Sequence, residues 1–84
     1  MTIKDYLKLK TVIIPDEPNV EAVLDEDTLI DVIKFDEVLR GDYEHAIMFY
    51  GERNEISEEF LNLEVKRYDI DKCTLMLYVW LVKK

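Results

Sequence analysis

The chain has 84 residues, of which 49% are hydrophobic, which suits one small domain over residues 1–84 and excludes a disordered acidic tail. The net charge of −8 makes free nucleic acid a poor partner, because phosphates repel carboxylates. The single cysteine excludes an intramolecular disulfide, and the charged N-terminus lacks the apolar stretch of a signal peptide, so we expect a cytoplasmic protein.

Residues Thr2–Lys8 have the pattern of a short amphipathic helix. Thr2 can act as its N-cap, and Asp5, three residues later, suits the positive end of the helix dipole. Spacings of three and four place the apolar residues of this helix on one face: Ile3, Tyr6 and Leu7. We expect the helix to lie over a sheet.

The next segment is interrupted by two prolines. The β-branched run Thr11–Ile14 predicts a short strand, and we expect Asp16–Asn19 to be a loop because proline breaks regular structure. Val20–Leu24 fits either a helical turn or a strand. The acidic cluster Asp25–Asp27 resembles part of a calcium loop, but residues 25–36 lack the glycine of its sharp turn, so we expect no metal there.

Leu29–Phe35 is ambiguous between strand and helix. Its β-branched residues favour a strand, whereas a helix that began near residue 28 could run to Leu39, with Gly41 just beyond its end. We favour the strand, followed by Asp36–Asp42 as a polar connection.

Tyr43–Tyr50 predicts a further strand, closed by Gly51, with apolar side chains on both faces. His45, the one histidine of the sequence, falls inside it. Because no cysteine, second histidine or nucleophile lies beside it in the sequence, the pattern favours a strand histidine with one hydrogen bond over a zinc ligand or a general base.

The following residues predict a helix and a hairpin. Within Asn54–Leu63, Ser57 is a good N-cap, and two glutamates follow it in the first turn. Val65–Ile70 then predicts a strand, and Asp71-Lys72 predicts a tight connection. We expect Cys73 to be a small packed residue at the start of the last strand.

Thr74–Lys84 is the most apolar run, and we expect it to be an interior strand with both faces packed. Alternation places on its first face Leu75, Leu77, Val79 and Leu81, and on its second face Thr74, Met76, Tyr78, Trp80 and Val82. A helix or a partner should cover the second face. The run is shorter than the roughly 20 residues of a membrane-spanning helix, and the final residues Lys83 and Lys84 discourage further pairing.

Together these elements predict an α+β fold: a single small domain with an antiparallel sheet of about four strands and short helices on one side. One histidine, one cysteine and scattered carboxylates form the whole catalytic inventory. Because the sequence has no nucleophile–base signature, we expect neither an enzyme nor a cofactor.

The tail ISEEFLNLEVKRYDIDKCTLMLYVW, together with the opening helix, resembles small uncharacterised phage and mobile-element proteins of Gram-positive bacteria. Those proteins also end with a short helix, a step such as Asn62–Val65, and an apolar strand such as Leu75–Val79. The resemblance itself implies no activity. In size and charge the chain is similar to phage proteins that inhibit host enzymes, including anti-CRISPR proteins, restriction inhibitors and uracil-DNA glycosylase inhibitors, which implies the cytoplasm of a bacterial host.

The acidic residues concentrate in the middle of the chain, where sixteen acids against three basic residues give residues 16–64 a net charge of −13. They could form an ordinary solvated surface. They could instead imitate nucleic-acid phosphates, and so dock on the basic groove of a bacterial defence enzyme and inhibit it. The candidate contact residues are Asp25, Glu26, Asp27, Asp31, Asp36, Glu37, Asp42 and Glu44. The alternative is a structural or regulatory interaction module, such as a homodimer through the apolar last strand.

Overall fold

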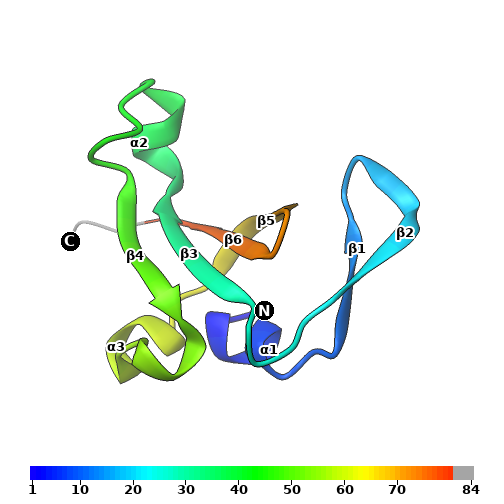
Figure 1. Cartoon of the computed structure of the whole chain (residues 1–84). Coiled ribbons are helices and arrows are strands. Elements are labelled where there is room, and N and C mark those ends of the chain that lie inside the picture. Colours follow the sequence, from blue (N-terminus) through cyan, green and yellow to red (C-terminus); the bar gives the residue numbers. More distant parts are fainter. Residues whose placement is uncertain (81–84) are drawn as a thin grey trace.

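A four-stranded sheet carries the fold in the computed structural model, which describes residues 1–80 (Figure 1). Its strands, in spatial order, are β4 (Ile47–Glu52), β3 (Leu29–Lys34), β6 (Thr74–Val79) and β5 (Val65–Asp71). A separate hairpin pairs β1 (Thr11–Ile14) with β2 (Glu17–Val23), and the helices are α1 (Ile3–Leu7), α2 (Phe35–Leu39) and α3 (Glu58–Leu61), with a 3₁₀ turn at Arg53–Glu55. The predicted α+β class and the sheet of four strands are confirmed.

The sheet is mixed rather than wholly antiparallel. β3 pairs antiparallel with β4, and β6 pairs antiparallel with β5, but the two central strands β3 and β6 run parallel. The reason is the chain path: residues 53–64 lead from β4 at one edge to β5 at the opposite edge, and the hairpin then inserts β6 at the centre. Local patterns cannot reveal this order, because it depends on a crossover between distant segments.

One face of the sheet, here called the first face, holds the main core. Five side chains on it are fully buried: Ile30 and Val32 from β3, and Leu75, Leu77 and Val79 from β6. This confirms the predicted alternation of the last strand and its interior position, while its final predicted residues, Leu81–Lys84, lie outside the described part of the chain. Complete burial of one such aliphatic side chain stabilises a fold by roughly 1.5–3 kcal/mol.

Helix α1 closes the first face, as its sequence predicts. The hydroxyl of Thr2 accepts a hydrogen bond from the backbone N–H of Asp5, and the carboxylate of Asp5 accepts one from the backbone N–H of Thr2, which forms a capping box. Ile3 is fully buried, and Tyr6 and Leu7 pack beside it. Ser57 precedes α3 as expected, although its side chain makes no capping hydrogen bond, and α3 also packs on this core.

Helix α2 packs against the opposite face, so the helices do not all lie on one side as predicted. That opposite face, here called the second face, presents Asp31 and Ile33 from β3 and Met76 and Tyr78 from β6. Phe35 and Val38 bring α2 against a small buried cluster there, formed by Ile33, Ala46 and Tyr78.

The loop predicted at Asp16–Asn19 is wrong for most of its length, because strand β2 begins at Glu17. The same strand shows that the ambiguous segment Val20–Leu24 is mainly a strand rather than a helical turn. Only Pro15 and Asp16 form the turn, and the strand begins at Glu17 and continues through Pro18. The pairing shifts between Ile13 and Ile14, which leaves residues 18–20 out of the ladder. Proline is tolerated there because a bulge does not need its missing N–H.

The ambiguous segment that starts at Leu29 contains both predicted elements, a strand followed directly by a helix. The strand ends at Lys34, and a helix follows directly where a polar connection was predicted. Its end has the Schellman pattern: the N–H of Gly41 donates to the carbonyl of Val38, and the N–H of Asp42 donates to the carbonyl of Glu37. Gly41 has φ +82° and serves as the residue after the helix, as its position predicts.

Replacement of Gly41 by alanine is expected to lower the free energy of unfolding by about 1–2 kcal/mol, the usual penalty for an L-residue at positive φ. No heavy atom would touch the added Cβ, so backbone strain alone is tested. Urea denaturation measures the change. The control is Arg40→Ala at the preceding residue, where φ is −82° and the change should stay within about 0.5 kcal/mol. Equal losses in the two variants would contradict the strained turn.

Two predicted strand positions are in fact turns. The strand predicted at Tyr43–Tyr50 begins only at Ile47 and continues past Gly51 to Glu52, so His45 lies in a turn instead. Cys73 is exposed rather than packed, because Lys72 and Cys73 form the hairpin turn between the paired residues Asp71 and Thr74. Lys72 adopts φ +57° there.

Candidate functional site: an apolar cavity around Asp31 on the second face

The eight candidate contact residues fall into three groups. Asp25, Glu26 and Asp27 lie in the loop before β3, Asp31 lies in the middle of β3, and the other four follow β3: Asp36, Glu37, Asp42 and Glu44. The first and last groups lie at opposite ends of β3 (Figure 1). This strand has six residues, so it is about 20 Å long at roughly 3.3 Å per residue. The structure therefore does not gather all eight carboxylates into one cluster.

The first group builds its own loop. The Oδ1 atom of Asp25 accepts hydrogen bonds from the backbone N–H of Asp27 at 2.9 Å and from the hydroxyl of Thr28 at 3.3 Å. The Thr28 hydroxyl oxygen in turn accepts one from the backbone N–H of Asp25 at 3.0 Å. Such local bonds are typical of an Asx-type turn, so the carboxylate of Asp25 has a structural role. Within residues 1–80, no three histidine, cysteine or acidic side chains are grouped to hold a metal ion.

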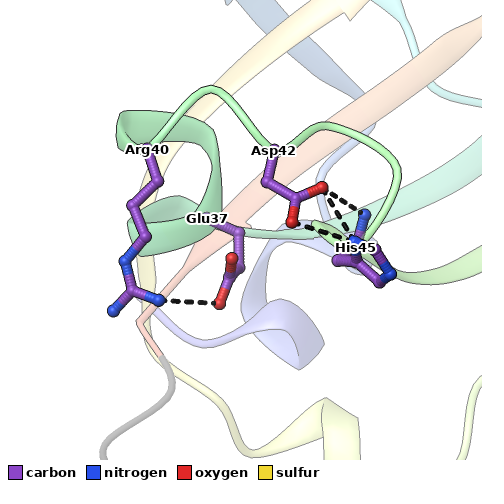
Figure 2. Close-up of polar contacts among 4 residues, drawn as sticks. All are labelled: Glu37, Arg40, Asp42 and His45. Atoms are coloured by element: carbon purple, nitrogen blue, oxygen red, sulfur yellow. Dashed lines mark hydrogen bonds and ion pairs between the residues drawn. The ribbon is translucent and has the colours of Figure 1, made fainter.

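The last group lies on α2 and the loop after it (Figure 2). Glu37 pairs with Arg40 at 3.4 Å, and the carboxylate of Asp42 lies 2.9 Å from Nδ1 of His45. Asp42 also accepts the backbone N–H of His45 at 3.2 Å. Hydrogen bonds from the His45 side chain and backbone lower the pKa of Asp42. The same contacts stabilise the exposed turn that is present where the sequence predicted a strand.

Asp31 and the segment after β3 meet around a cavity of about 210 Å³ on the second face. Its lining comes from four segments: Asp31 and Ile33 of β3, Val38, Tyr43 and Ala46 of α2 and the following loop, Ile47 of β4, and Met76 and Tyr78 of β6. Among the lining residues that lie within residues 1–80, Asp31 is the one with a charged side chain, and the others are apolar or aromatic. The same segment that supplies three of the lining residues carries Asp36, Glu37, Asp42 and Glu44, here called the acidic rim.

Asp31 is half-buried between Tyr50 of β4 and Met76 of β6, its neighbours across the sheet. Its Oδ1 atom is covered and has no hydrogen-bond partner among the described residues. Three ion pairs form among residues 1–80, and none of them includes Asp31. Burial raises the pKa of Asp31, because the charged form loses hydration that no protein donor replaces.

Replacement of Asp31 by asparagine is therefore expected to stabilise the protein at neutral pH. The pKa of Asp31 is higher in the folded than in the unfolded chain, so the native protein loses stability as pH rises from the ordinary value of 3.8 through the raised pKa. Thermal unfolding of both proteins from pH 3.5 to pH 7 should show a difference in Tm that grows with pH in favour of the variant. Glu26→Gln controls for the loss of one negative charge at an exposed site. A difference that shrinks with rising pH contradicts the assignment.

Sequence reasoning identified Asp31, Met76 and Tyr78 separately, but it did not place them together. The alternation within Leu29–Lys34 already puts Asp31 and Ile33 on one strand face. The residues of α2 and its loop were missed because their position depends on how this segment folds back over the sheet.

No family model, curated protein or solved structure matches the chain. None of the helices within residues 1–80 has the length and hydropathy needed to cross a membrane.

Proposed function

We propose that the protein is a non-catalytic, phage-type inhibitor that binds the basic groove of a bacterial nucleic-acid-targeting defence enzyme. The observation that supports this proposal is the apolar cavity on the second face, with Asp31 in its lining and the acidic rim on the segment that supplies Val38, Tyr43 and Ala46 to that lining. An apolar centre with a polar border has the anatomy of many protein–protein contact surfaces.

Charge supplies the preference for a basic target. The acidic rim and Asp31 add negative potential to a molecule whose net charge is already −8. Such a field speeds the encounter with a basic groove and repels free nucleic acid. The loop Asp25–Asp27, at the other end of β3, acts only through this long-range field, because the distance separates it from the cavity.

Titration of purified CRISPR nucleases and restriction endonucleases with the protein tests the proposal. The measurements are cleavage inhibition and association rate at rising salt. The test variant Glu37→Gln with Glu44→Gln should slow association by about tenfold at low salt, because it removes two charges from the acidic rim. The matched control, Glu17→Gln with Glu21→Gln, removes two exposed charges from β2 and should slow association much less, because it reduces the net negative charge equally but leaves the acidic rim intact. Inhibition that does not weaken as the salt concentration rises, or the lack of inhibition of any of these enzymes, counts against the proposal.

A homodimer is the second candidate function. Apolar side chains remain exposed, at 53% for Ile47, which lines the cavity, 57% for Tyr50 and 41% for Trp80. Because β6 lies between β3 and β5, it has no free edge, so a dimer would need contact between two second faces. Light scattering at high protein concentration tests the homodimer, because a protein that stays strictly monomeric would contradict it.

A further inference from the structure

The cavity on the second face is smaller than a typical small-molecule site. Its volume of about 210 Å³ lies below the roughly 300–1,000 Å³ of such sites. Its size therefore suits a single side chain that projects from a partner, with an apolar stem against Ile33, Val38 and Met76.

The charge inside the cavity selects the head group of that side chain. Asp31 contributes a carboxylate that no cation neutralises within the described residues. Asp69 of β5 lies on the same row of the second face, because Asp31 and Asp69 both pair with Met76. Arg67 of β5 lies one row away, opposite Tyr78, and its guanidinium carbon lies 4.8 Å from the centre of the Tyr78 ring. A cationic head group inside the cavity would thus meet the carboxylate of Asp31, while Asp69 lies two strands away on the same face, outside the lining.

The lining also discriminates between the two basic side chains. Tyr43 and Tyr78 supply aromatic rings, and Arg67 already lies over the ring of Tyr78, so the exposed ring of Tyr43 is the one left for an incoming group. A planar guanidinium stacks on such a ring more favourably than an ammonium ion does. A carboxylate also accepts stronger hydrogen bonds from a guanidinium than from a neutral donor. Because the Oδ1 atom of Asp31 is covered by the protein, the incoming head group would donate to the other carboxylate oxygen.

We propose that this cavity receives an arginine side chain of a protein partner, which forms an ion pair with Asp31. The inference rests on the proposed function in one respect: the partner is a protein with a basic surface. The acidic rim on the neighbouring segment adds to the attraction as the arginine approaches.

Butylguanidinium, which reproduces the arginine head and stem, tests the cavity without any partner. In methyl NMR spectra of the whole protein, it should shift the signals of Ile33, Ile47 and Met76 in a saturable way, with a Kd in the millimolar range expected of so small a ligand. The methyl signals of Ile3 and Ile30, buried on the first face, should stay in place. Asp31→Asn should weaken binding at least about tenfold, as expected when one partner of a charge pair is lost, and Glu21→Gln, at an exposed position of β2, should leave it unchanged.

Four results would overturn the proposal. They are the lack of cavity shifts, equal binding to the Asp31→Asn variant, shifts of equal size with butylammonium, and shifts with protein concentration alone, which would identify a second copy as the occupant. The test is separate from the inhibition assay. Inhibition without butylguanidinium binding removes only the arginine site, whereas binding without inhibition of any enzyme removes the proposed function.

Discussion

Replacement of Leu77 by alanine is expected to lower the free energy of unfolding by about 2–5 kcal/mol, the range for large-to-small changes in a core. Leu77 is 0% exposed in β6, the strand that β3 and β5 flank. Its neighbours on the first face are held by pairing on both sides, so they cannot easily close the space that the side chain leaves. Because small domains are stable by only about 5–15 kcal/mol, this one change removes a large share of the total. Urea denaturation followed by circular dichroism measures it.

Leu39→Ala is the matched control, since it makes the same chemical change where the side chain is 66% exposed. It lies in α2, where alanine is an equally good helix former, so the expected change stays within about 0.5 kcal/mol. A loss in Leu77→Ala as small as in the control would contradict the assignment of β6 as the centre of the core.

The elements that could be predicted are those whose signals are local and agree with one another. The last strand is apolar, alternates cleanly and is rich in β-formers, so propensity and periodicity gave the same answer. Helix α1 has an N-cap at Thr2 and an apolar face within its own sequence, so its start could also be predicted.

Predictions failed where tertiary structure decides between local signals of similar strength. In Leu29–Leu39, a strand propensity and a helix-stop signal both act, and only the register with β4 and β6 determines that the strand ends at Lys34. The predicted strand at Tyr43–Tyr50 is shortened by the turn that Asp42 and His45 hold. Neither competition is visible in residue order alone.

The candidate site shows the same limit. The sequence indicated an acidic middle and an apolar second face as unrelated features. They meet because β3 places Asp31 beside Met76 of the parallel strand, a contact between residues 45 positions apart in the chain. The same folding separates Asp25–Asp27 from the rest, although the sequence places all eight acids within twenty residues.

Replacement of Tyr78 by alanine is expected to cost about 3–5 kcal/mol, as for other large aromatic residues in a core. Tyr78 is 7% exposed on the second face, and the centre of its ring lies 6.1 Å from that of Phe35 in an edge-on contact. The guanidinium carbon of Arg67 lies 4.8 Å from the same ring centre, so the change also removes a cation–π contact. Urea denaturation measures the loss.

Two variants serve as controls. Tyr78→Phe removes the hydroxyl but keeps the ring, and Tyr50→Ala removes a tyrosine from an exposed position on the same face of the sheet. The Tyr78 hydroxyl makes no side-chain hydrogen bond within residues 1–80, so Tyr78→Phe should change stability by less than about 1 kcal/mol. Tyr50 lies one row away on the same face but is 57% exposed, so its loss should cost far less than that of Tyr78. If Tyr78→Ala cost no more than Tyr50→Ala, the second face would not be packed around Tyr78, and the floor of the proposed arginine cavity would be lost with it.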